Sequence, residues 1–254
     1  MEEPVRLSKR MSELGLASRR EADTYIERGL VLVNGQRATL GQKVTTKDVI
    51  TLDTKIHLAQ NEQISVVLNK PIGYVSGQAE DGYEPAKVLI RNENHWGKDE
   101  NTRSLNPKML AHLVPAGRLD IDSTGLLILT QNGRLVKKII GEDAKTDKEY
   151  IVRVAQIVTG ALGADAAQIA KLRFGLSLDG KALQRARVEA INEAELRFTL
   201  IEGKKRQIRR MCEAVGLKVL RLKRVRVGPV VLGPLPLGTW RYLTDIEARK
   251  LLDF

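Results

Sequence analysis

RLSKRMSELGLASRREADTYIERGLVLVNGQRA, residues 6–38, opens the chain with the pattern of two short helices. Leu7 to Leu14 is expected to be helical and to end at Gly15, because glycine readily takes the left-handed conformation that terminates a helix. Ser18 and Glu21 form a capping-box pattern, in which each side chain bonds the other residue's backbone amide. A second helix is therefore predicted to begin there and to end near the next glycine.

The same stretch continues into a hairpin. Asn34-Gly35 suits a two-residue turn with two positive φ angles, so residues 31–33 and 36–38 are expected to pair. A further strand is predicted over 49–52, and the polar residues 54–63 read as a linker. The chain is therefore expected to divide into residues 1–60, a small unit with its linker, and residues 61–254, a larger domain.

Four cations lie on or between the two predicted helices: Lys9, Arg10, Arg19 and Arg20. Helix starts and cations suit a phosphate backbone, but solvated helix faces balanced by nearby acids explain them equally well. The stretch as a whole resembles the S4-type RNA-binding domain over residues 5–53. That resemblance favours RNA as the partner of these four residues.

The charge of the chain also indicates a polyanionic partner. Its 254 residues contain 42 Lys and Arg against 31 Asp and Glu, a formal net charge of +11. Residues 201–254 hold thirteen of these cations against five acids. A basic surface can serve solubility alone, but nucleic acid is the first partner to consider.

The rarer residues exclude several classes of protein. Cys212 is the only cysteine, so neither a disulfide framework nor a cysteine-based zinc site is possible. Three scattered histidines show no metal-ligand spacing, and no apolar run reaches the length of a membrane span. The sequence predicts a cytoplasmic protein without a metal, a cofactor or a membrane partner.

From Ile64 onward the chain reads as mixed strand and helix, so the fold class is α+β. Strands are predicted over 64–69, 126–130, 149–154, 196–201 and 219–227. Helices are predicted over 133–140, 164–172, 204–215 and 245–252. Residues 76–112 have little periodicity and read as a long surface excursion.

Three further motifs could carry chemistry. GRLDIDSTGLL, residues 117–127, places Asp120 and Asp122 in a turn directly before an apolar strand. Such residues are usually turn formers, but loops at strand ends also favour active sites. Two nearby carboxylates would also be compatible with a glycosidase or a metal site.

EGKKRQIRRMC, residues 202–212, is the second motif. On a helix, Ile208 belongs to an apolar stripe with Met211 and Cys212. Arg206, Arg209 and Arg210 then occupy another face, where they repel each other unless anions lie close. A solvated cationic face is the plain interpretation. A buried carboxylate together with RNA phosphates is the functional one.

The third motif is LKRVRVG, residues 222–228. Strand alternation is expected to put Arg224 and Arg226 on one face and the valines on the other. Basic side chains on a strand beside a basic helix would line an RNA groove.

Together these motifs resemble the RsuA family of pseudouridine synthases. The resemblance also rests on Asn69-Lys70-Pro71 and on Lys148-Glu149-Tyr150, and the motifs stand in the family order behind the S4-type domain. The sequence of residues 206–213 most closely resembles the RluF-like branch, which acts on 23S ribosomal RNA. The implied fold is a mixed, mainly antiparallel sheet surrounded by helices, with a central catalytic cleft.

The resemblance also implies roles for single residues. Asp120 would be the catalytic carboxylate, Tyr150 would stack on the target uracil, and Arg209 would pair with Asp120. Ile208 would wall the base pocket, and Arg118 would enter the gap left by the flipped nucleotide. A further set would contact RNA phosphates: Arg206, Arg210, Arg224 and Arg226. The protein would act as a monomer on ribosomal RNA or on an assembling ribosomal subunit.

This chemistry fits the residues available. Converting uridine to pseudouridine breaks the bond to N1 of uracil and joins C5 to the ribose, so no group or electron is transferred and no cofactor is needed. One ionised carboxylate suffices as nucleophile or base. The competing hypothesis is a non-catalytic RNA-binding or ribosome-assembly factor, which would not require Asp120, Tyr150 and Arg209 to converge.

Overall fold

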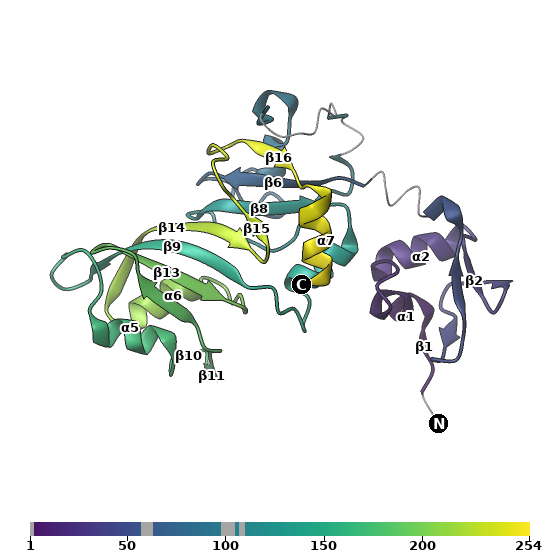
Figure 1. The fold of residues 1–254 in the computed structure, drawn as a ribbon, viewed down its shortest axis with the longest axis horizontal. Coiled ribbons are helices and arrows are strands. Elements are labelled where there is room, and N and C mark those ends of the chain that lie inside the picture. Colours follow the sequence, from purple (N-terminus) through teal and green to yellow (C-terminus); the bar gives the residue numbers. More distant parts are fainter. Residues whose placement is uncertain (1–2, 57–62, 98–104, 107–109) are drawn as a thin grey trace.

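The computed structural model describes residues 3–56, 63–97, 105–106 and 110–254 (Figure 1). Figure 1 shows a small N-terminal unit beside a larger domain built on one curved sheet. Most of the stretch expected to be a linker, residues 57–62, lies outside the described residues.

The N-terminal unit confirms the predicted helices and hairpin. Helices α1 (Leu7–Glu13) and α2 (Arg19–Glu27) pack together, and α2 begins with the expected capping box. The Ser18 Oγ accepts from the Glu21 amide at 3.3 Å, and Glu21 Oε2 accepts from the Ser18 amide at 2.8 Å. The hairpin strands and their neighbour form a sheet in the order β3 (Gln36–Arg37), β2 (Val31–Val33), β5 (Ile50–Leu52).

One strand pair of this unit was not predicted. β1 (Val5–Arg6) pairs with β4 (Lys43–Val44) in antiparallel fashion. Each strand has two residues, which is too short for a period-two pattern to be visible in the sequence. The buried side chains of the unit all lie between Leu7 and Ile56, so it has a core of its own.

The larger domain is built on a nine-stranded sheet, in which β12, β13, β9, β14, β8, β6 and β16 follow one another, while β15 lies beside β14 and β7 beside β8. Its strands are β6 (Ser65–Lys70), β7 (Val114–Pro115), β8 (Thr124–Thr130), β9 (Lys148–Gln156), β12 (Arg187–Ala190), β13 (Glu195–Leu200), β14 (Leu217–Val227), β15 (Val230–Val231) and β16 (Trp240–Tyr242). Among the described strands of this sheet only β14 and β8 run parallel, so the expected mixed, mainly antiparallel sheet is confirmed.

Helices cover the sheet on both faces. They are α4 (Gly133–Ile140), α5 (Ala166–Arg173), α6 (Gln207–Ala214) and α7 (Asp245–Asp253). α4 and α7 pack on the face of β8 that carries Leu126 and Ile128. α5 and α6 pack with β9, β13 and β14 on the opposite side. Among the described residues no helix has the length and apolarity needed to cross a membrane.

The segment expected to be a surface excursion, residues 76–112, is mostly exposed in its described part, but several of its residues anchor it to the core. Its described part contains two 3₁₀ turns, η1 (Ala86–Leu89) and η2 (Asn92–Asn94). Ala86, Leu89 and Ile90 are buried against Trp240 in the same core cluster as β6 and β8. The Trp240 Nε1 also donates to the Arg91 carbonyl at 2.8 Å. The sequence did not predict these anchors, because an irregular backbone can bury side chains without any sequence periodicity.

Candidate active site

Asp120 lies in a short turn between β7 and β8. The Ser123 amide donates to the Asp120 carbonyl at 3.0 Å, which closes the turn. Leu119, directly before Asp120, is buried in the core beneath β8, and its amide and carbonyl both bond the buried Ser76 Oγ at 2.8 Å. The backbone next to Asp120 is therefore fixed by the packing of Leu119 and by the hydrogen bonds of the Ser76 hydroxyl group.

Two buried cations hold the flanks of this turn. Lys70, at the end of β6, is fully buried, and its Nζ donates to the Ser123 carbonyl at 2.9 Å and the Pro71 carbonyl at 2.8 Å. Arg224, on β14, is also buried and donates to the carbonyls of Leu126 at 2.7 Å and Arg118 at 3.2 Å. Three of these carbonyls belong to the turn, since Arg118 lies two residues before Asp120, and Ser123 and Leu126 lie three and six residues after it.

Arg224 therefore corrects an expectation. It was predicted to contact RNA phosphates, but it is 3% exposed and its guanidinium is committed to two carbonyls. Its Nη2 is buried, and the described part of the chain offers that atom no hydrogen-bond partner. Its position identifies it as part of the support of the Asp120 turn.

The buried cations also set the local electrostatics. Burial lowers the pKa of Lys70 to about 8, while the negative charges of Asp120 and Asp122 act in the opposite direction. Burial and the charge of Arg224 likewise lower the pKa of Lys148 to about 8. Lys148, the first residue of β9, donates to the Ile139 and Ile201 carbonyls at 2.9 and 3.3 Å. Lys70 and Arg224 thus place buried positive charge next to the turn, and Lys148 lies within electrostatic reach of Arg224.

Asp122 is the carboxylate that meets helix α6. Arg206 forms a two-pronged pair with it at 3.2 and 3.0 Å. Arg209 reaches the Asp122 carboxylate at 3.3 Å and its backbone carbonyl at 2.9 Å. Burial raises the pKa of Asp122, but the Arg206 hydrogen bond and the charges of both arginines outweigh this and hold the pKa below its ordinary value.

The expected pairing of Arg209 with Asp120 is therefore wrong for this structure. The turn projects Asp122 toward the start of α6, two residues further along than predicted, and Asp122 takes both arginines. Asp120 is half-buried, and its carboxylate makes no hydrogen bond or ion pair to any residue that the structure describes. Its charge still acts on Lys70 and Arg206, so it lies within their electrostatic reach.

Tyr150 lies next to this region on β9. It is directly opposite Arg224 in the β9–β14 register. Its half-buried side chain packs against the core clusters of both halves of the sheet. The tyrosine therefore stands where the two halves meet, on the same face as the side chain that supports the Asp120 turn.

Ile208 belongs to the core of the domain. It is 4% exposed and packs with Met211 and Cys212 beneath α6, so the predicted apolar stripe is confirmed. It contributes to the packing that fixes Arg209 on the adjacent helix surface. Ile208 was expected to wall a base pocket, but its buried side chain offers no open surface for that role.

Arg226 corrects the predicted strand alternation. It pairs with Asp147 at 2.8 and 2.7 Å and with Glu149 at 3.4 Å instead of standing free for phosphates. A register shift lies between Arg224 and Arg226, so they oppose Tyr150 and Glu149, which are consecutive on β9. Consecutive strand residues face opposite sides, and the bulge therefore sends the two arginines to opposite faces.

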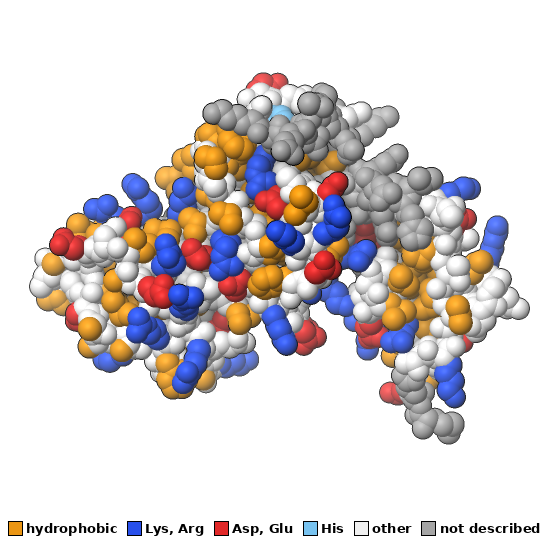
Figure 2. Space-filling view, in the orientation of Figure 1, with side chains coloured by type: hydrophobic (Ala, Val, Ile, Leu, Met, Phe, Trp, Pro, Cys, Tyr) orange, Lys and Arg blue, Asp and Glu red, His pale blue; other side chains and the backbone are white. Residues whose placement is uncertain are grey.

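The remaining predicted contacts are more exposed. Arg210 pairs with Asp179 at 3.0 and 2.6 Å, and Arg118 lies 3.7 Å from Glu80 with most of its side chain in solvent. In the N-terminal unit, Lys9 and Arg10 lie near Glu13, while Arg19 and Arg20 are exposed at the start of α2. Figure 2 shows Lys and Arg side chains spread over both units, with acids among them.

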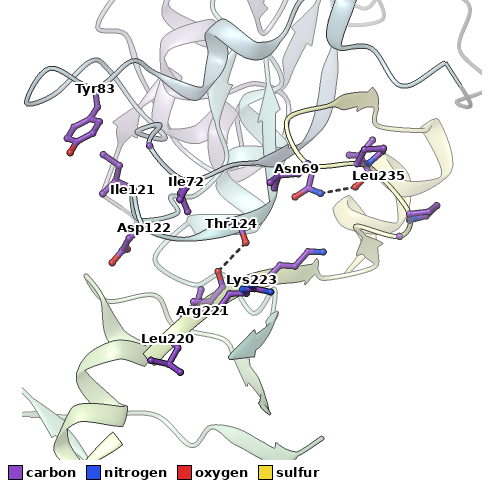
Figure 3. Close-up of a pocket in the computed structure, with 16 residues that line it drawn as sticks. Asn69, Ile72, Tyr83, Ile121, Asp122, Thr124, Leu220, Arg221, Lys223 and Leu235 are labelled. Atoms are coloured by element: carbon purple, nitrogen blue, oxygen red, sulfur yellow. Dashed lines mark hydrogen bonds between the residues drawn. The ribbon is translucent and has the colours of Figure 1, made fainter. Parts of the chain in front are cut away.

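A groove of about 980 Å³ opens beside the turn. Figure 3 shows Asp122, Ile121 and Ile72 on one side of it, with Leu220 and Arg221 of β14 opposite. Its walls also include Lys223 and the turn 233–237. Asp120, Tyr150 and Arg209 are not among the lining residues, so the groove adjoins the predicted catalytic group through Asp122.

Sequence reasoning missed the roles of Lys70, Lys148 and Asp122. The two lysines stand inside motifs that were recognised, but their burial and their bonds to carbonyls were not predicted. Nothing local in the sequence indicates that a lysine will bond carbonyls of distant strands. Within the described ranges no three His, Cys, Asp or Glu side chains are grouped as metal ligands would be.

The class of protein follows from fold and site together with the comparisons. Residues 64–214 match the family described as RNA pseudouridylate synthase, and residues 5–50 match the S4 domain. The chain belongs to the RNA pseudouridylate synthase family, and it is an RNA pseudouridine synthase, an isomerase.

Named relatives cover nearly the whole chain. The dual-specificity RNA pseudouridine synthase RluF of Escherichia coli K12 is 38% identical over 98% of this chain and 80% of that protein. The ribosomal large subunit pseudouridine synthase B of Bacillus subtilis is 32% identical over 97% of this chain and 95% of its own length. A crystal structure of a pseudouridylate synthase superposes with a TM-score of 0.65 at 26% identity, covering 97% and 99% of the two chains.

Proposed function

We propose that this synthase isomerises a uridine in the RNA of the large ribosomal subunit, 23S ribosomal RNA, with Asp120 as the catalytic carboxylate. The observation that carries the proposal is the state of Asp120. It is half-buried on a rigid turn, and among the described residues its carboxylate is bonded to no other group. A carboxylate held in place but left free can attack the ribose or the base.

The supports of the turn fit this role. Lys70 and Arg224 add positive charge beneath it without forming an ion pair with Asp120. Both cations bind main-chain carbonyls of the turn, which leaves the Asp120 carboxylate free to meet the substrate. Asp122 would act separately, because its pairs with Arg206 and Arg209 fasten the turn to α6. Arg209 is then a positioning residue that acts through Asp122.

The reaction needs the target base to leave its RNA stack. Enzymes that act on a base extrude it and receive it against aromatic side chains. Tyr150 is the aromatic residue at the junction of the sheet halves, and we assign it to stacking on the uracil. Arg118 is exposed beside the turn and would fill the space that the base leaves.

The RNA backbone would follow cations that remain accessible. Arg206 at the turn, Arg221 and Lys223 in the groove, and the four cations of the N-terminal unit are suited to phosphates. The names of the relatives, which specify RNA and the large ribosomal subunit, support ribosomal RNA as the substrate. We expect one protein chain to act alone on free RNA or on an assembling subunit.

The decisive experiment compares Asp120→Asn with wild type. The amide keeps the shape of the side chain but cannot be ionised, so pseudouridine formation should be lost while folding and RNA affinity remain. Asp143→Asn, at an exposed position between α4 and β9, is the matched control and should retain full turnover. The substrate is ribosomal RNA taken from cells that lack the protein. Each purified variant is incubated with this RNA, and the pseudouridines that form are mapped. Appreciable turnover by Asp120→Asn would exclude Asp120 as the catalytic group.

A further inference from the structure

Phe174 is an exposed aromatic side chain that the reaction does not use. It follows α5 in extended conformation and is 63% exposed, more than Tyr83 or Phe254. The guanidinium of Arg185 lies over its ring, 4.7 Å from the centroid. An exposed phenylalanine that carries an arginine on one face leaves its other ring face available to a flat ligand.

The surroundings of Phe174 are positively charged. A surface cavity of about 580 Å³ is lined by Phe174, three arginines and one acid, among other residues. Arg173 donates from Nε to the Val188 carbonyl at 2.8 Å, which caps part of the edge strand β12. Arg187 is mostly exposed and pairs with Glu189 at 2.9 Å. The cavity therefore keeps a net positive charge beside an aromatic ring.

A hairpin links the cavity to helix α6 beside the catalytic region. Residues 173–186 form a hairpin whose outer part contains β10 (Ser177–Leu178) and β11 (Lys181–Ala182). Its Asp179 pairs with Arg210 of α6, as described above. The Gln184 amide, next to Arg185, donates to Glu202 Oε1 at 3.0 Å, and the same oxygen accepts from Gln207 at the start of α6. One hairpin thus connects the cavity to the helix that holds Asp122.

We propose that Phe174 and Arg185 form a stacking site for an unpaired nucleobase of the RNA, outside the catalytic centre. Aromatic rings bind single-stranded RNA by stacking on bases, and nearby arginines bind the flanking phosphates. The cavity carries a net positive charge, because its one acid, Glu189, is already paired with Arg187. This charge attracts RNA phosphates and gives no attraction to a peptide without acidic residues. This proposal rests on the proposed RNA substrate and extends the path of the RNA along the 173–186 hairpin.

The test uses the full-length protein and a fluorescein-labelled single-stranded oligoribonucleotide of about ten nucleotides, within the length that one such site covers. Phe174→Ala should weaken its affinity by about 5- to 100-fold, the range expected for loss of one stacked base. Phe174→Trp should retain the affinity, since it keeps an aromatic face. Phe254→Ala removes another exposed phenylalanine and is the matched control, with no expected change.

A second measurement locates the base directly. A 5-iodouridine oligoribonucleotide should form a photo-crosslink to the peptide that contains Phe174, and Phe174→Ala should abolish it. Neither assay depends on isomerase activity, so failure of Asp120 as the catalyst would leave these results unaffected. Equal affinities of wild type and Phe174→Ala would overturn the stacking site. That outcome would leave the activity assigned to Asp120 untouched.

Discussion

Single buried cations determine the geometry around Asp120. Lys70 and Arg224 each give their charged group to main-chain carbonyls, in positions where water cannot reach them. Burying a charge is costly unless hydrogen bonds compensate it. Their retention beneath one turn therefore indicates a role in fixing that turn, and it separates Arg224 from the cations that could contact RNA.

Arg224→Lys tests whether Arg224 supports the Asp120 turn instead of contacting RNA. Lysine keeps the positive charge but cannot reach both the Leu126 and Arg118 carbonyls, so one buried acceptor loses its donor. We expect the free energy of unfolding to fall by about 1–3 kcal/mol. Turnover should fall as well, because the Asp120 turn loses its support. The salt dependence of RNA binding should not change.

Lys223→Gln is the matched control, since it removes the neighbouring charge, which lines the open groove. It should leave stability unchanged and reduce the slope of log affinity against log salt by about 0.7–0.9. Urea unfolding and filter-binding titrations at several salt concentrations measure both properties. A reduced slope in Arg224→Lys with unchanged stability would show that Arg224 contacts phosphate after all.

Lys148 makes stability depend on pH in a defined direction. Burial and Arg224 lower its pKa in the folded protein to about 8, from an ordinary value of 10.5. Between these values the unfolded chain holds a proton that the folded protein has released. The contribution to stability is thus complete above 10.5 and is lost as the pH falls through 8.

Lys148→Met should remove this dependence. The difference in unfolding free energy between wild type and variant should shift in favour of wild type as the pH rises from about 7 to about 10, by at most about 3 kcal/mol. Lys70 contributes equally to both proteins and cancels. Urea unfolding at three pH values provides the measurement. A difference that stays constant with pH would mean that Lys148 keeps an ordinary pKa.

At the scale of elements, the sequence was informative where patterns are long. The five longest strands and the four helices of the larger domain were predicted close to their observed bounds, because each carries several apolar residues at regular spacing. The strands β7, β10, β11, β12, β15 and β16 were missed, since two to four residues give no period to recognise. The bulge near Arg224 was missed because register depends on the partner strand.

The candidate site was predictable to a similar extent. The turn with Asp120 and the helix with Arg209 were found from local motifs. The choice of Asp122 as the partner of Arg209 depends on how the turn meets α6, 87 residues away in sequence. The partners of Arg224 lie 98 and 106 residues away. Contacts at such separations follow from tertiary packing, which local patterns do not encode.

Gly125 shows how one residue permits an element contact. It has φ of 105°, and a Cβ atom there would lie 2.2 Å from the Arg224 carbonyl oxygen. This close approach occurs where β8 and β14 run parallel. Gly125→Ala should therefore destabilise the domain by ~3 kcal/mol or more, through backbone strain and separation of the two strands.

Gly77→Ala is the control for this substitution, because no atom lies within 4 Å of a Cβ at that position. It should change the melting temperature little. Thermal melts followed by circular dichroism compare the two variants with wild type. If Gly125→Ala melted like wild type, the strands would have to be able to separate at this point without cost.

At the scale of the whole molecule, the two units have separate cores and a small contact. The core of the N-terminal unit ends at Ile56, and the core of the larger domain begins at Ile64. Between them, Lys137 Nζ of α4 donates to the Ser12 carbonyl at 2.7 Å, and Gln63 donates to Glu21 at 2.8 Å. The division into residues 1–60 and 61–254 stays a prediction, because its boundary falls among residues 57–62, which the structure does not describe.

The contact depends on a glycine at the start of α4. A Cβ atom on Gly133 would lie 2.3 Å from the Ser18 Cβ and 2.7 Å from the Glu21 carboxylate. Gly133→Ala should thus push the two units apart without unfolding either, since alanine is the better helix former. If RNA spans both units, their separation should also weaken RNA affinity.

Small-angle scattering should show a larger radius of gyration for Gly133→Ala, whereas Arg134→Ala, one residue along the same helix and exposed, should match wild type. If Gly133→Ala and wild type gave the same scattering and the same RNA affinity, the units would not be held together at Gly133. Their relative position would then be set by the RNA alone.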